Sequence, residues 1–391
     1  MSGNFDFRIV QMHLTDKCNL RCSYCYEDRA QRTSGVMPLA TAQAIAARHL
    51  TQEGPHTRVE IDFIGGEPLL AWDRIVGVVD YVHQHKWPKK YSFTFSTNGT
   101  LFNDEMKAWL DRHSCVAFSF SIDGTRAAHN LNRCDSYDRA MQHVPWALER
   151  ARRLKVEPRV KMTIGPDTVA LIADGVKELH AMGFGRVDAN VPYENIWGDR
   201  VEPCLETFAG ELEKLVEFYL QHPEYEPARL VDLPFEKIDT EKAEDEYPRW
   251  CGSGSPMICY DVEGNALPCH RFVTVSTGQK YEGPLSFPTK TWEEARKIEP
   301  GPCADCLFVA ACPSCMALNW LENGDVDRRT HWHCGFILLQ IKASAKFKIL
   351  RLSKQIAEAP ATDEGRQRVT GLQPLLDKAL AVHDLFSSIS V

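Results

Sequence analysis

The first half of the chain alternates short apolar segments with longer amphipathic ones. Strands are predicted at residues 7–14, 58–64, 91–96, 115–122, 158–164 and 186–191, and helices at residues 38–50, 72–85, 104–112, 137–154 and 169–182. This alternation predicts right-handed βαβ units and one parallel sheet. It ends near residue 195, whereas a complete eight-stranded barrel needs roughly 250 residues. We therefore predict an α/β fold that begins with a partial, TIM-like (β/α)6 barrel.

The pattern changes after residue 195. A helix is predicted at residues 202–220, and an acidic, proline-rich linker at residues 223–247. Cysteine, glycine and proline then dominate, which indicates a region held by ligation rather than by an apolar core. Two more helices follow, interrupted near Pro360. We expect a barrel at residues 1–195, a bridging helix and linker at 196–250, a small cysteine-rich domain at 251–335 and C-terminal helices at 336–391.

Three cysteines follow the first predicted strand in the segment TDKCNLRCSYCY, at Cys18, Cys22 and Cys25. Three thiolates on one loop can hold three irons of a [4Fe–4S] cluster and leave the fourth iron open to a small molecule. Zinc sites usually take four ligands in two separated pairs and fit this spacing poorly. The alternative is three unrelated buried cysteines. The position directly after a strand favours the cluster.

Polar residues follow the next predicted strands. Gly65, Gly66 and Glu67 end the second strand, Asn98 follows the third, and Ser121 and Asp123 end the fourth. Parallel α/β sheets place their active sites at this end of the strands. Two glycines let the backbone approach a ligand closely, and a carboxylate can accept hydrogen bonds from an ammonium group. Taken alone, Gly-Gly-Glu-Pro is an ordinary turn between a strand and a helix.

A second group of eight cysteines occupies the cysteine-rich region. Its members are Cys251, Cys259, Cys269, Cys303, Cys306, Cys312, Cys315 and Cys334. Eight thiolates suffice for two fully ligated four-iron clusters or for two Cys₄ zinc sites, and the spacing alone does not separate the two. Cys115, Cys134 and Cys204 have no place in this pattern.

Composition narrows the classes of function. Of the 391 residues, 44% are apolar and 25% charged, as in a globular enzyme, and the net charge of −8 is not gathered in blocks, so we expect no nucleic-acid partner. No apolar run approaches the roughly 18 residues of a membrane span, and no signal peptide is recognised. We expect a cytoplasmic protein without a membrane partner. In that reducing compartment, fourteen cysteines indicate metal or cluster ligands before disulfides.

The cysteine loop, with Gly-Gly-Glu-Pro one βα unit later, resembles the radical S-adenosylmethionine (radical SAM) superfamily. The resemblance implies that the open iron chelates SAM and that an electron from the cluster splits SAM into methionine and a 5′-deoxyadenosyl radical. It implies a SAM site formed by Tyr24, Tyr26, Gly65, Gly66, Glu67, Asn98, Ser121 and Asp123. In the segment SIDGTRAAHNLNR, Arg133 is the candidate to pair with the SAM carboxylate. A solvated surface arginine is the alternative.

The second cysteine group resembles the SPASM domain, which carries two auxiliary [4Fe–4S] clusters in radical SAM enzymes that modify peptides and proteins. Carried over, Cys251, Cys259, Cys269 and Cys315 hold one cluster, and Cys303, Cys306, Cys312 and Cys334 hold the other. The gap between Cys312 and Cys315 is one residue shorter than usual. In sulfatase-maturating relatives an aspartate after the third cysteine takes the substrate proton. Here His270 stands there, either as a proton acceptor or as a donor to a cluster sulfur.

These resemblances imply an enzyme that abstracts hydrogen from a residue of a peptide, giving an oxidised or cross-linked side chain as in ribosomal-peptide maturation. Expected partners are the peptide substrate and a low-potential electron donor such as flavodoxin or ferredoxin. Because few residues precede the first strand, leader binding is expected at the barrel, the C-terminal helices or a separate leader-binding protein. The alternatives are a sulfatase maturase acting on C/S-x-P-x-R peptides, a radical SAM enzyme acting on a small metabolite, and a zinc-ribbon interaction protein.

Overall fold

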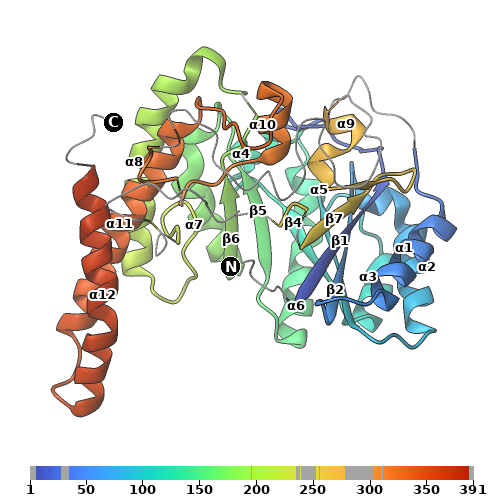
Figure 1. The fold of residues 1–391 in the computed structure, drawn as a ribbon, viewed down its shortest axis with the longest axis horizontal. Helices are drawn as coiled ribbons and strands as arrows, with labels where there is room; N and C mark the ends of the chain where they lie inside the picture. The colour runs from blue at the N-terminus through green and yellow to red at the C-terminus, as the bar shows by residue number, and fades with distance from the viewer. Residues whose placement is uncertain are drawn as a thin grey trace.

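The computed structural model describes residues 6–27, 35–194, 196–234, 238, 252–254, 256–277, 303, 305–309 and 311–386. Its centre is one sheet (Figure 1). Six parallel strands follow the order of the chain, namely β1 (Phe7–Thr15), β2 (Arg58–Gly65), β3 (Lys90–Thr97), β4 (Val116–Ser121), β5 (Arg159–Thr163) and β6 (Arg186–Asn190). Because this order never reverses, right-handed crossovers place all connecting helices on one face, as in a barrel. The predicted six-stranded partial barrel is confirmed.

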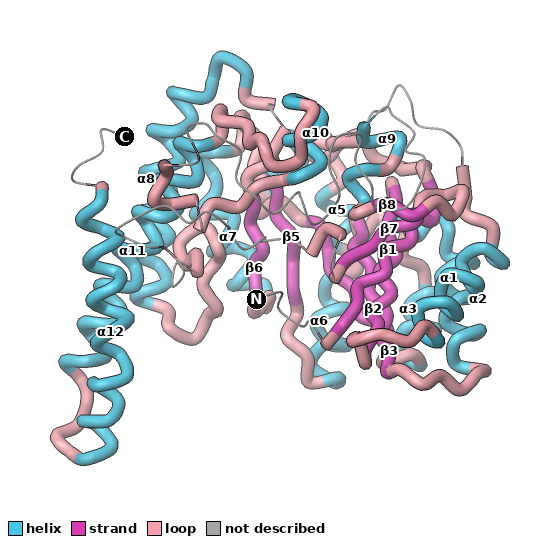
Figure 2. The backbone as a smooth tube through the Cα atoms, viewed as in Figure 1, coloured by secondary structure: helices cyan, strands magenta, loops and turns pink. Residues whose placement is uncertain are grey.

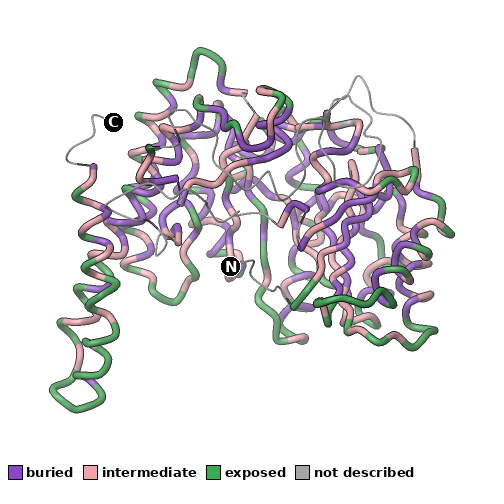
Figure 3. The backbone as a smooth tube through the Cα atoms, viewed as in Figure 1, coloured by how far each residue is buried: buried purple, intermediate pink, exposed green. Residues whose placement is uncertain are grey.

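Helices cover the outer face of this sheet (Figure 2). They are α1 (Leu39–Thr51), α2 (Trp72–His83), α3 (Asp104–Arg112), α4 (Arg126–Asn132), α5 (Tyr137–Met141), α6 (Val144–Leu154) and α7 (Ile172–Met182), with 3₁₀ turns at Pro68–Ala71 and Val169–Leu171. Alternate strand residues such as Met12, Ile61 and Phe93 are buried in the hydrophobic core. Buried stretches of the backbone lie along the central strands (Figure 3). This packing fixes which side chains point inward.

The inner face of the sheet is polar, unlike the apolar interior of a complete barrel. A cavity of about 510 Å³ lies there, and its polar lining includes Glu60, Asp62, Ser92, Thr94, Ser96, Ser119, Arg159, Lys161 and Asp188. Lys161 Nζ on β5 donates to Ser96 Oγ on β3 at 2.7 Å. Strict alternation of apolar and polar residues therefore gives this sheet one core face and one face that can meet polar ligands.

The prediction for the segment after β4 is wrong in one respect and incomplete in another. The expected single helix at residues 137–154 is two helices, α5 and α6, because Pro145 in the first turn of α6 favours a new helix start. Helix α4 was not predicted. It begins after Thr125, whose side chain accepts a hydrogen bond from Ala128 N.

The cysteine-rich region contributes to the barrel sheet. Strand β7 (Met257–Tyr260) pairs in parallel with β1, and β8 (Ala266–Leu267) pairs antiparallel with β7. This extension was not predicted. The region also contains a 3₁₀ turn at His270–Phe272 and the helices α9 (Thr274–Thr277) and α10 (Met316–Asn323). The domain boundaries stay a prediction, but the register of β7 ties this region directly to the strand that leads into the cysteine loop.

Three long helices lie beside the end of the sheet that β6 forms. A 3₁₀ turn at Gly198–Arg200 leads into α8 (Val201–Gln221), against which α11 (Cys334–Ala357) packs. Helix α12 (Asp363–Leu385) returns along α11, and the two form a hairpin that extends beyond the sheet (Figure 1). The predicted break near Pro360 is confirmed. None of the helices in the described part of the chain has the length and apolar character that a membrane crossing requires.

We predict that Arg150→Met lowers the free energy of unfolding by about 3 kcal/mol. Arg150 of α6 is buried and donates to the carbonyl oxygens of Leu110, His113 and Val116 at 2.9 to 3.2 Å. Methionine would remove all of these charged hydrogen bonds and leave Leu110 O and His113 O with only the backbone donors His113 N and Val116 N. Urea unfolding followed by circular dichroism would measure the change.

Arg152→Met is the matched control for this prediction. Arg152 lies two residues away on α6 and is exposed, and it pairs with Glu149 on the surface. Its loss should cost less than about 1 kcal/mol. Equal destabilisation by the two substitutions would show that the buried hydrogen bonds of Arg150 do not join α6 to the sheet.

Candidate active site

The cysteine loop is bonded to the turn that follows β2. Gly66 N donates to Thr15 O, and Glu67 N donates to Lys17 O, both at 2.9 Å. A Cβ atom on Gly65 would lie 2.4 Å from Thr15 O, and one on Gly66 would lie 2.4 Å from Lys17 O. Gly65 also has a φ of +148°, which favours glycine. The backbone that approaches these glycines closely is therefore that of the cysteine loop itself, which the sequence did not reveal.

The side chain of Glu67 joins the ends of two strands. Its carboxylate is buried and accepts hydrogen bonds from Leu69 N, Thr97 Oγ1 and Asn98 N at 2.7 to 3.1 Å. Burial raises the pKa of Glu67 to about 7, while these hydrogen bonds and Arg133 act in the opposite direction. The carboxylate thus fixes the turns after β2 and β3 relative to each other, and its contact with SAM stays a prediction.

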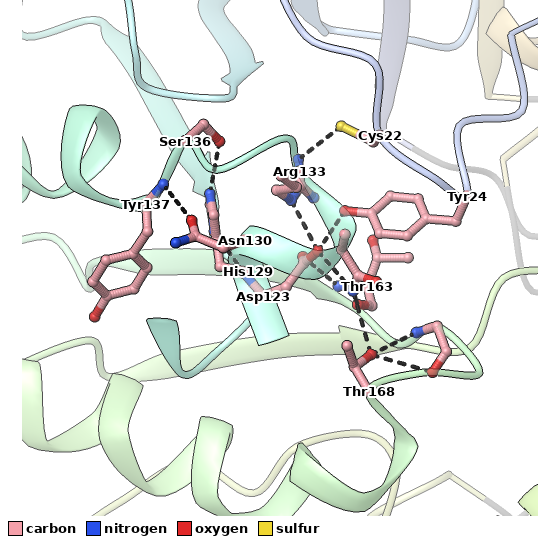
Figure 4. Close-up of polar contacts among 12 residues, drawn as sticks. Cys22, Tyr24, Asp123, His129, Asn130, Arg133, Ser136, Tyr137, Thr163 and Thr168 are labelled. Carbon is pink, nitrogen blue, oxygen red and sulfur yellow. Dashed lines mark hydrogen bonds and ion pairs between the residues drawn. The ribbon is translucent and has the colours of Figure 1, made fainter. Parts of the chain in front are cut away.

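A buried carboxylate, Asp123, organises the other side of the site (Figure 4). Its Oδ2 accepts from Tyr24 Oη at 2.6 Å and from Asn132 Nδ2 at 3.2 Å, and its Oδ1 accepts from Thr163 N at 2.9 Å. Arg133 Nε lies 3.0 Å from the same Oδ2. Asp123 therefore holds together the cysteine loop, the end of α4 and the end of β5.

Arg133 is buried, so it is not the solvated surface arginine that the sequence left open. Its guanidinium lies 5.3 Å from the centre of the Tyr24 ring, and its Nη1 lies 4.0 Å from Cys22 Sγ. The next two residues, Cys134 and Asp135, have φ values of 54° and 50°. Each such non-glycine conformation costs roughly 1 kcal/mol. The sharp turn lets Arg133 reach the cysteine loop.

One cavity of about 380 Å³ brings together most of the predicted SAM site. Its lining includes Cys18, Cys22, Cys25, Tyr24, Tyr26, Gly65, Gly66, Glu67, Asn98, Ser121 and Arg133. Asp123 is not in this lining and contacts Tyr24 and Arg133 from behind. The lining also includes Thr163, Asn190, Tyr193, Glu194 and Arg271, which were not predicted. Thr163 and Asn190 end β5 and β6, so their position at strand ends was the signal that could have found them.

The four cysteines that the SPASM resemblance assigns to the second auxiliary cluster lie close together. Cys303, Cys306, Cys312 and Cys334 all line one cavity of about 60 Å³. Arg329 is buried in the same lining, and its Nη1 donates to Cys312 O at 3.0 Å. Burial raises the pKa of Cys312 to about 12, and the charge of Arg329 opposes this shift. The four thiols that the SPASM resemblance groups by sequence are therefore grouped in space.

Of the four cysteines that the resemblance assigns to the first auxiliary cluster, the structure describes three. Cys259, Cys269 and Cys315 lie in one buried apolar cluster with Phe272. Burial raises the pKa of Cys259 well above its usual range. Cys251 lies outside the described residues. Cys269 and Cys315 also line a cavity of about 310 Å³.

The spacing of the thiols bears on which metal they could hold. In the described part of the chain, no three His, Cys, Asp or Glu side chains are arranged to hold a single metal ion. The thiolates of a four-iron cluster bind different irons, so they lie farther apart than the ligands of one ion.

The remaining three cysteines have other surroundings. Cys115 Sγ lies 3.3 Å from His83 Nε2, Cys134 Sγ donates to Arg21 O at 3.0 Å, and Cys204 is buried on α8.

His270 lines the 310 Å³ cavity and lies close to the 380 Å³ cavity. Its ring centre is 5.7 Å from that of Tyr26, which lines the second of these cavities. Burial, with smaller effects of Lys161 and His13, lowers the pKa of His270 to about 3, so the imidazole is neutral at physiological pH. Arg271 lines both cavities, pairs with Glu194 and lies over the Tyr26 ring at 4.4 Å. The cavity that would hold SAM thus adjoins the auxiliary cysteines.

The described residues form a parallel partial barrel with a three-cysteine loop and a Gly-Gly-Glu turn at its carboxyl edge. Residues 12–169 match the family model of the Radical SAM superfamily. The predicted resemblance to this superfamily is confirmed over these residues.

Two curated relatives share parts of this region. The GTP 3′,8-cyclase of Clostridium perfringens is 25% identical over 164 residues, which are 41% of this chain and 49% of that protein. The mycofactocin maturase MftC of Mycobacterium ulcerans is 32% identical over 120 residues, 30% of this chain and 29% of that protein. The chain thus spans less than half the length of these relatives.

Two solved structures share the fold over most of the chain. anSMEcpe with bound AdoMet superposes with a TM-score of 0.67 at 17% identity, covering 93% of this chain and 98% of that one. SuiB of Streptococcus suis bound to the precursor peptide SuiA has a TM-score of 0.57 at 14% identity, covering 83% and 75%. The partial barrel, the cysteine-rich region and the C-terminal helices therefore have counterparts of known fold.

We predict that Gly66→Ala prevents the first cluster from being held. The added methyl group would meet Lys17 O and the Cβ of Cys18, at 2.4 and 3.0 Å, and would push the cysteine loop away from β2. After anaerobic reconstitution, the variant should carry about four fewer irons per chain than the native protein, the content of one cluster. Gly210→Ala on α8, where nothing lies within 4 Å, is the control and should keep its iron. Full iron content in Gly66→Ala would contradict the role of this contact.

Proposed function

We propose that this chain uses radical SAM chemistry to abstract a hydrogen atom from a residue of a peptide, and that the product is an oxidised or cross-linked side chain. The observation that carries the proposal is the single cavity shared by Cys18, Cys22, Cys25, the Gly-Gly-Glu turn, Ser121 and Arg133. When bound, a [4Fe–4S] cluster and SAM would supply the reducing electron and the 5′-deoxyadenosyl radical.

The residues of this cavity divide the binding of these groups between them. The three cysteines would hold the cluster, while the turn at Gly65 and Glu67 would take the amino group of SAM. Arg133 is the cation that could face the SAM carboxylate, since it is buried, oriented by Asp123 and next to Cys22. Guanidinium groups bind carboxylates in a fixed planar geometry, which supports this assignment. Tyr24, Tyr26, Asn98 and Ser121 would complete the site.

A peptide substrate is supported by the position of the 310 Å³ and 380 Å³ cavities, which share part of their linings. Both include residues 190–193 and Arg271 in their linings, so a substrate between them would face the SAM site on one side and His270 on the other. Among the structures of similar fold, SuiB holds its precursor peptide. A low-potential electron donor is required to reduce the first cluster, and a separate leader-binding protein stays part of the proposal.

The two auxiliary cysteine sets would hold two further [4Fe–4S] clusters. The common cavity of Cys303, Cys306, Cys312 and Cys334 supports one of them, and the apolar cluster around Cys259, Cys269 and Cys315 supports the other. Reduction potentials of such clusters span about −700 to +450 mV, so these clusters could accept the electron that the substrate loses.

Anaerobic reconstitution with dithionite-driven SAM cleavage tests the proposed function. We expect about twelve irons per chain, the content of three clusters, and formation of 5′-deoxyadenosine. Cys22→Ala should abolish cleavage because it removes a ligand of the SAM-binding cluster. Iron without 5′-deoxyadenosine would overturn the proposal, and so would zinc in place of iron. Turnover of a C/S-x-P-x-R peptide would redirect it to sulfatase maturation.

We predict separately that Cys334→Ala lowers the iron content by about four per chain and leaves SAM cleavage within about twofold of native. Cys334 lines the cavity of the second auxiliary set, away from the three cysteines of the first loop. Cys115→Ala is the control, because Cys115 lies beside His83 and outside both sets. Unchanged iron in Cys334→Ala would remove this set from the cluster ligands.

A further inference from the structure

Lys161 is a cation on the inner face of β5 that the proposed function has not used. Its register partners are Ser121 on β4 and Asp188 on β6. Ile122 N donates to Lys161 O at 2.9 Å, which holds this part of β5 beside the end of β4. Ser121 lines the candidate SAM site, and neighbouring strands lie about 4.8 Å apart. Lys161 therefore stands one strand away from that site.

The side chain of Lys161 lies where two cavities adjoin. It lines the polar cavity of about 510 Å³, and its Nζ donates to Ser96 Oγ at 2.7 Å. Ser96 lines both this cavity and the 380 Å³ cavity of the candidate SAM site. Ligand sites typically have volumes of roughly 300 to 1,000 Å³. A substrate group in the polar cavity can thus reach Lys161 while its neighbouring atoms face the candidate SAM site.

The ammonium group of Lys161 keeps hydrogens for a ligand. Lysine has three N–H donors, and the hydrogen bond to the serine uses one of them. Among the described residues, Lys161 forms no ion pair. Two carboxylates that line the same cavity have partners of their own. Asp62 Oδ2 accepts from Gln11 Nε2 at 3.1 Å. Asp188 Oδ1 accepts from Arg186 Nε at 2.8 Å.

A carboxylate is the ligand group that suits this arrangement. Hydrogen bonds between an ammonium and a carboxylate are roughly twice as strong as those between neutral groups. Ser96 and Ser119, whose hydroxyl oxygens lie 3.2 Å apart, offer further O–H donors beside the ammonium. The carboxylate of SAM already has a candidate partner in the buried Arg133. The carboxylate that would meet Lys161 therefore belongs to the substrate.

We propose that Lys161 is a specificity-determining residue that binds a carboxylate of the peptide substrate, and that this contact holds a neighbouring C–H group toward the candidate SAM site. The inference rests on the proposed function and narrows its substrates to peptides with an acidic group at the modified position. That group is either the side chain of an aspartate or glutamate or the carboxyl terminus of the peptide. The chemistry of recognition is the same, and the experiment separates the two sources.

The direct test is protection of Lys161 from acetylation by acetic anhydride, measured by mass spectrometry. The reconstituted full chain is used with SAM and without a reductant, so that no turnover occurs. N-acetyl-glutamate amide carries a side-chain carboxylate, N-acetyl-alanyl-alanine a terminal one, and N-acetyl-glutamine amide neither. Each is added at about 50 mM, above the millimolar dissociation constant of a weak contact. We expect one acidic probe to lower the acetylation of Lys161 by about twofold or more and the neutral probe to leave it unchanged.

Lys86 is the internal control, because it is exposed and lines neither of the two cavities. Its acetylation should be the same with all three probes. Protection of Lys161 by the glutamate probe would assign the contact to an acidic side chain, and protection by the alanyl-alanine probe would assign it to the carboxyl terminus. Equal protection by the neutral probe, or by none of the three, would overturn the inference. Complete protection by SAM alone would also overturn it, since Lys161 would then belong to the SAM site.

Kinetics give a second readout that a purely structural role would not move. With a peptide that the native enzyme modifies, Lys161→Met should raise KM by about tenfold or more, because a hydrogen bond between charged groups is lost. Lys161→Arg keeps the charge and should recover part of this loss, and Lys86→Met should keep the native KM. Conversion of the peptide carboxylate to an amide should cost the native enzyme a similar factor and Lys161→Met little. An equal cost of this conversion in both enzymes would refute the contact.

The inference and the proposed function can fail separately. Absence of 5′-deoxyadenosine formation by the native chain would refute the proposed function, while the acetylation result would still decide whether Lys161 binds a carboxylate. Formation of 5′-deoxyadenosine by a chain in which no acidic probe protects Lys161 would refute the inference alone.

Discussion

The candidate site depends on the buried ion pair between Asp123 and Arg133. Burying two charges is costly unless each keeps its hydrogen bonds, and removing one partner of such a pair typically costs about 3–5 kcal/mol. Asp123 meets this requirement with Tyr24, Asn132 and a backbone N–H from β5 as well as Arg133. Three segments that are far apart in the sequence are thereby held at one point. The cysteine loop has no extensive apolar core of its own, so these contacts with Asp123 hold it in place.

Much of the barrel could be predicted because its signals are local. Each strand is a short alternating segment, and each polar residue of the site follows a strand at its carboxyl end. Parallel pairing then brings these ends together without further information. Ser121 and Asp123 were found in this way. Thr163 and Asn190 end the last two strands by the same rule, but they belong to no motif that singled them out.

Other features depend on contacts between distant segments and left no local pattern. Strand β7 has four residues and pairs with β1 across some 250 positions of sequence, so nothing near Met257 marks its partner. The glycines after β2 were assigned to a ligand because their close neighbour, the carbonyl of Lys17, belongs to another segment. In the sequence, Gln11 is an ordinary polar residue of an alternating strand, and nothing near it predicts its contact with His270. The two interleaved auxiliary cysteine sets could be separated only by resemblance, and three-dimensional proximity supports that division.

The pairing of β7 with β1 has a mechanical consequence. Residues 9–12 of β1 lie in register with residues 257–260, so Cys259 stands opposite Gln11, seven residues before Cys18. A hydrogen-bonded ladder stretches very little. Thermal motion of the cysteine-rich region therefore carries the first loop with it, and the separation between redox groups bound at the two places would stay nearly constant. Electron tunnelling rates fall steeply with separation, so a shared strand would act as a spacer that keeps the rate uniform while the surrounding loops move.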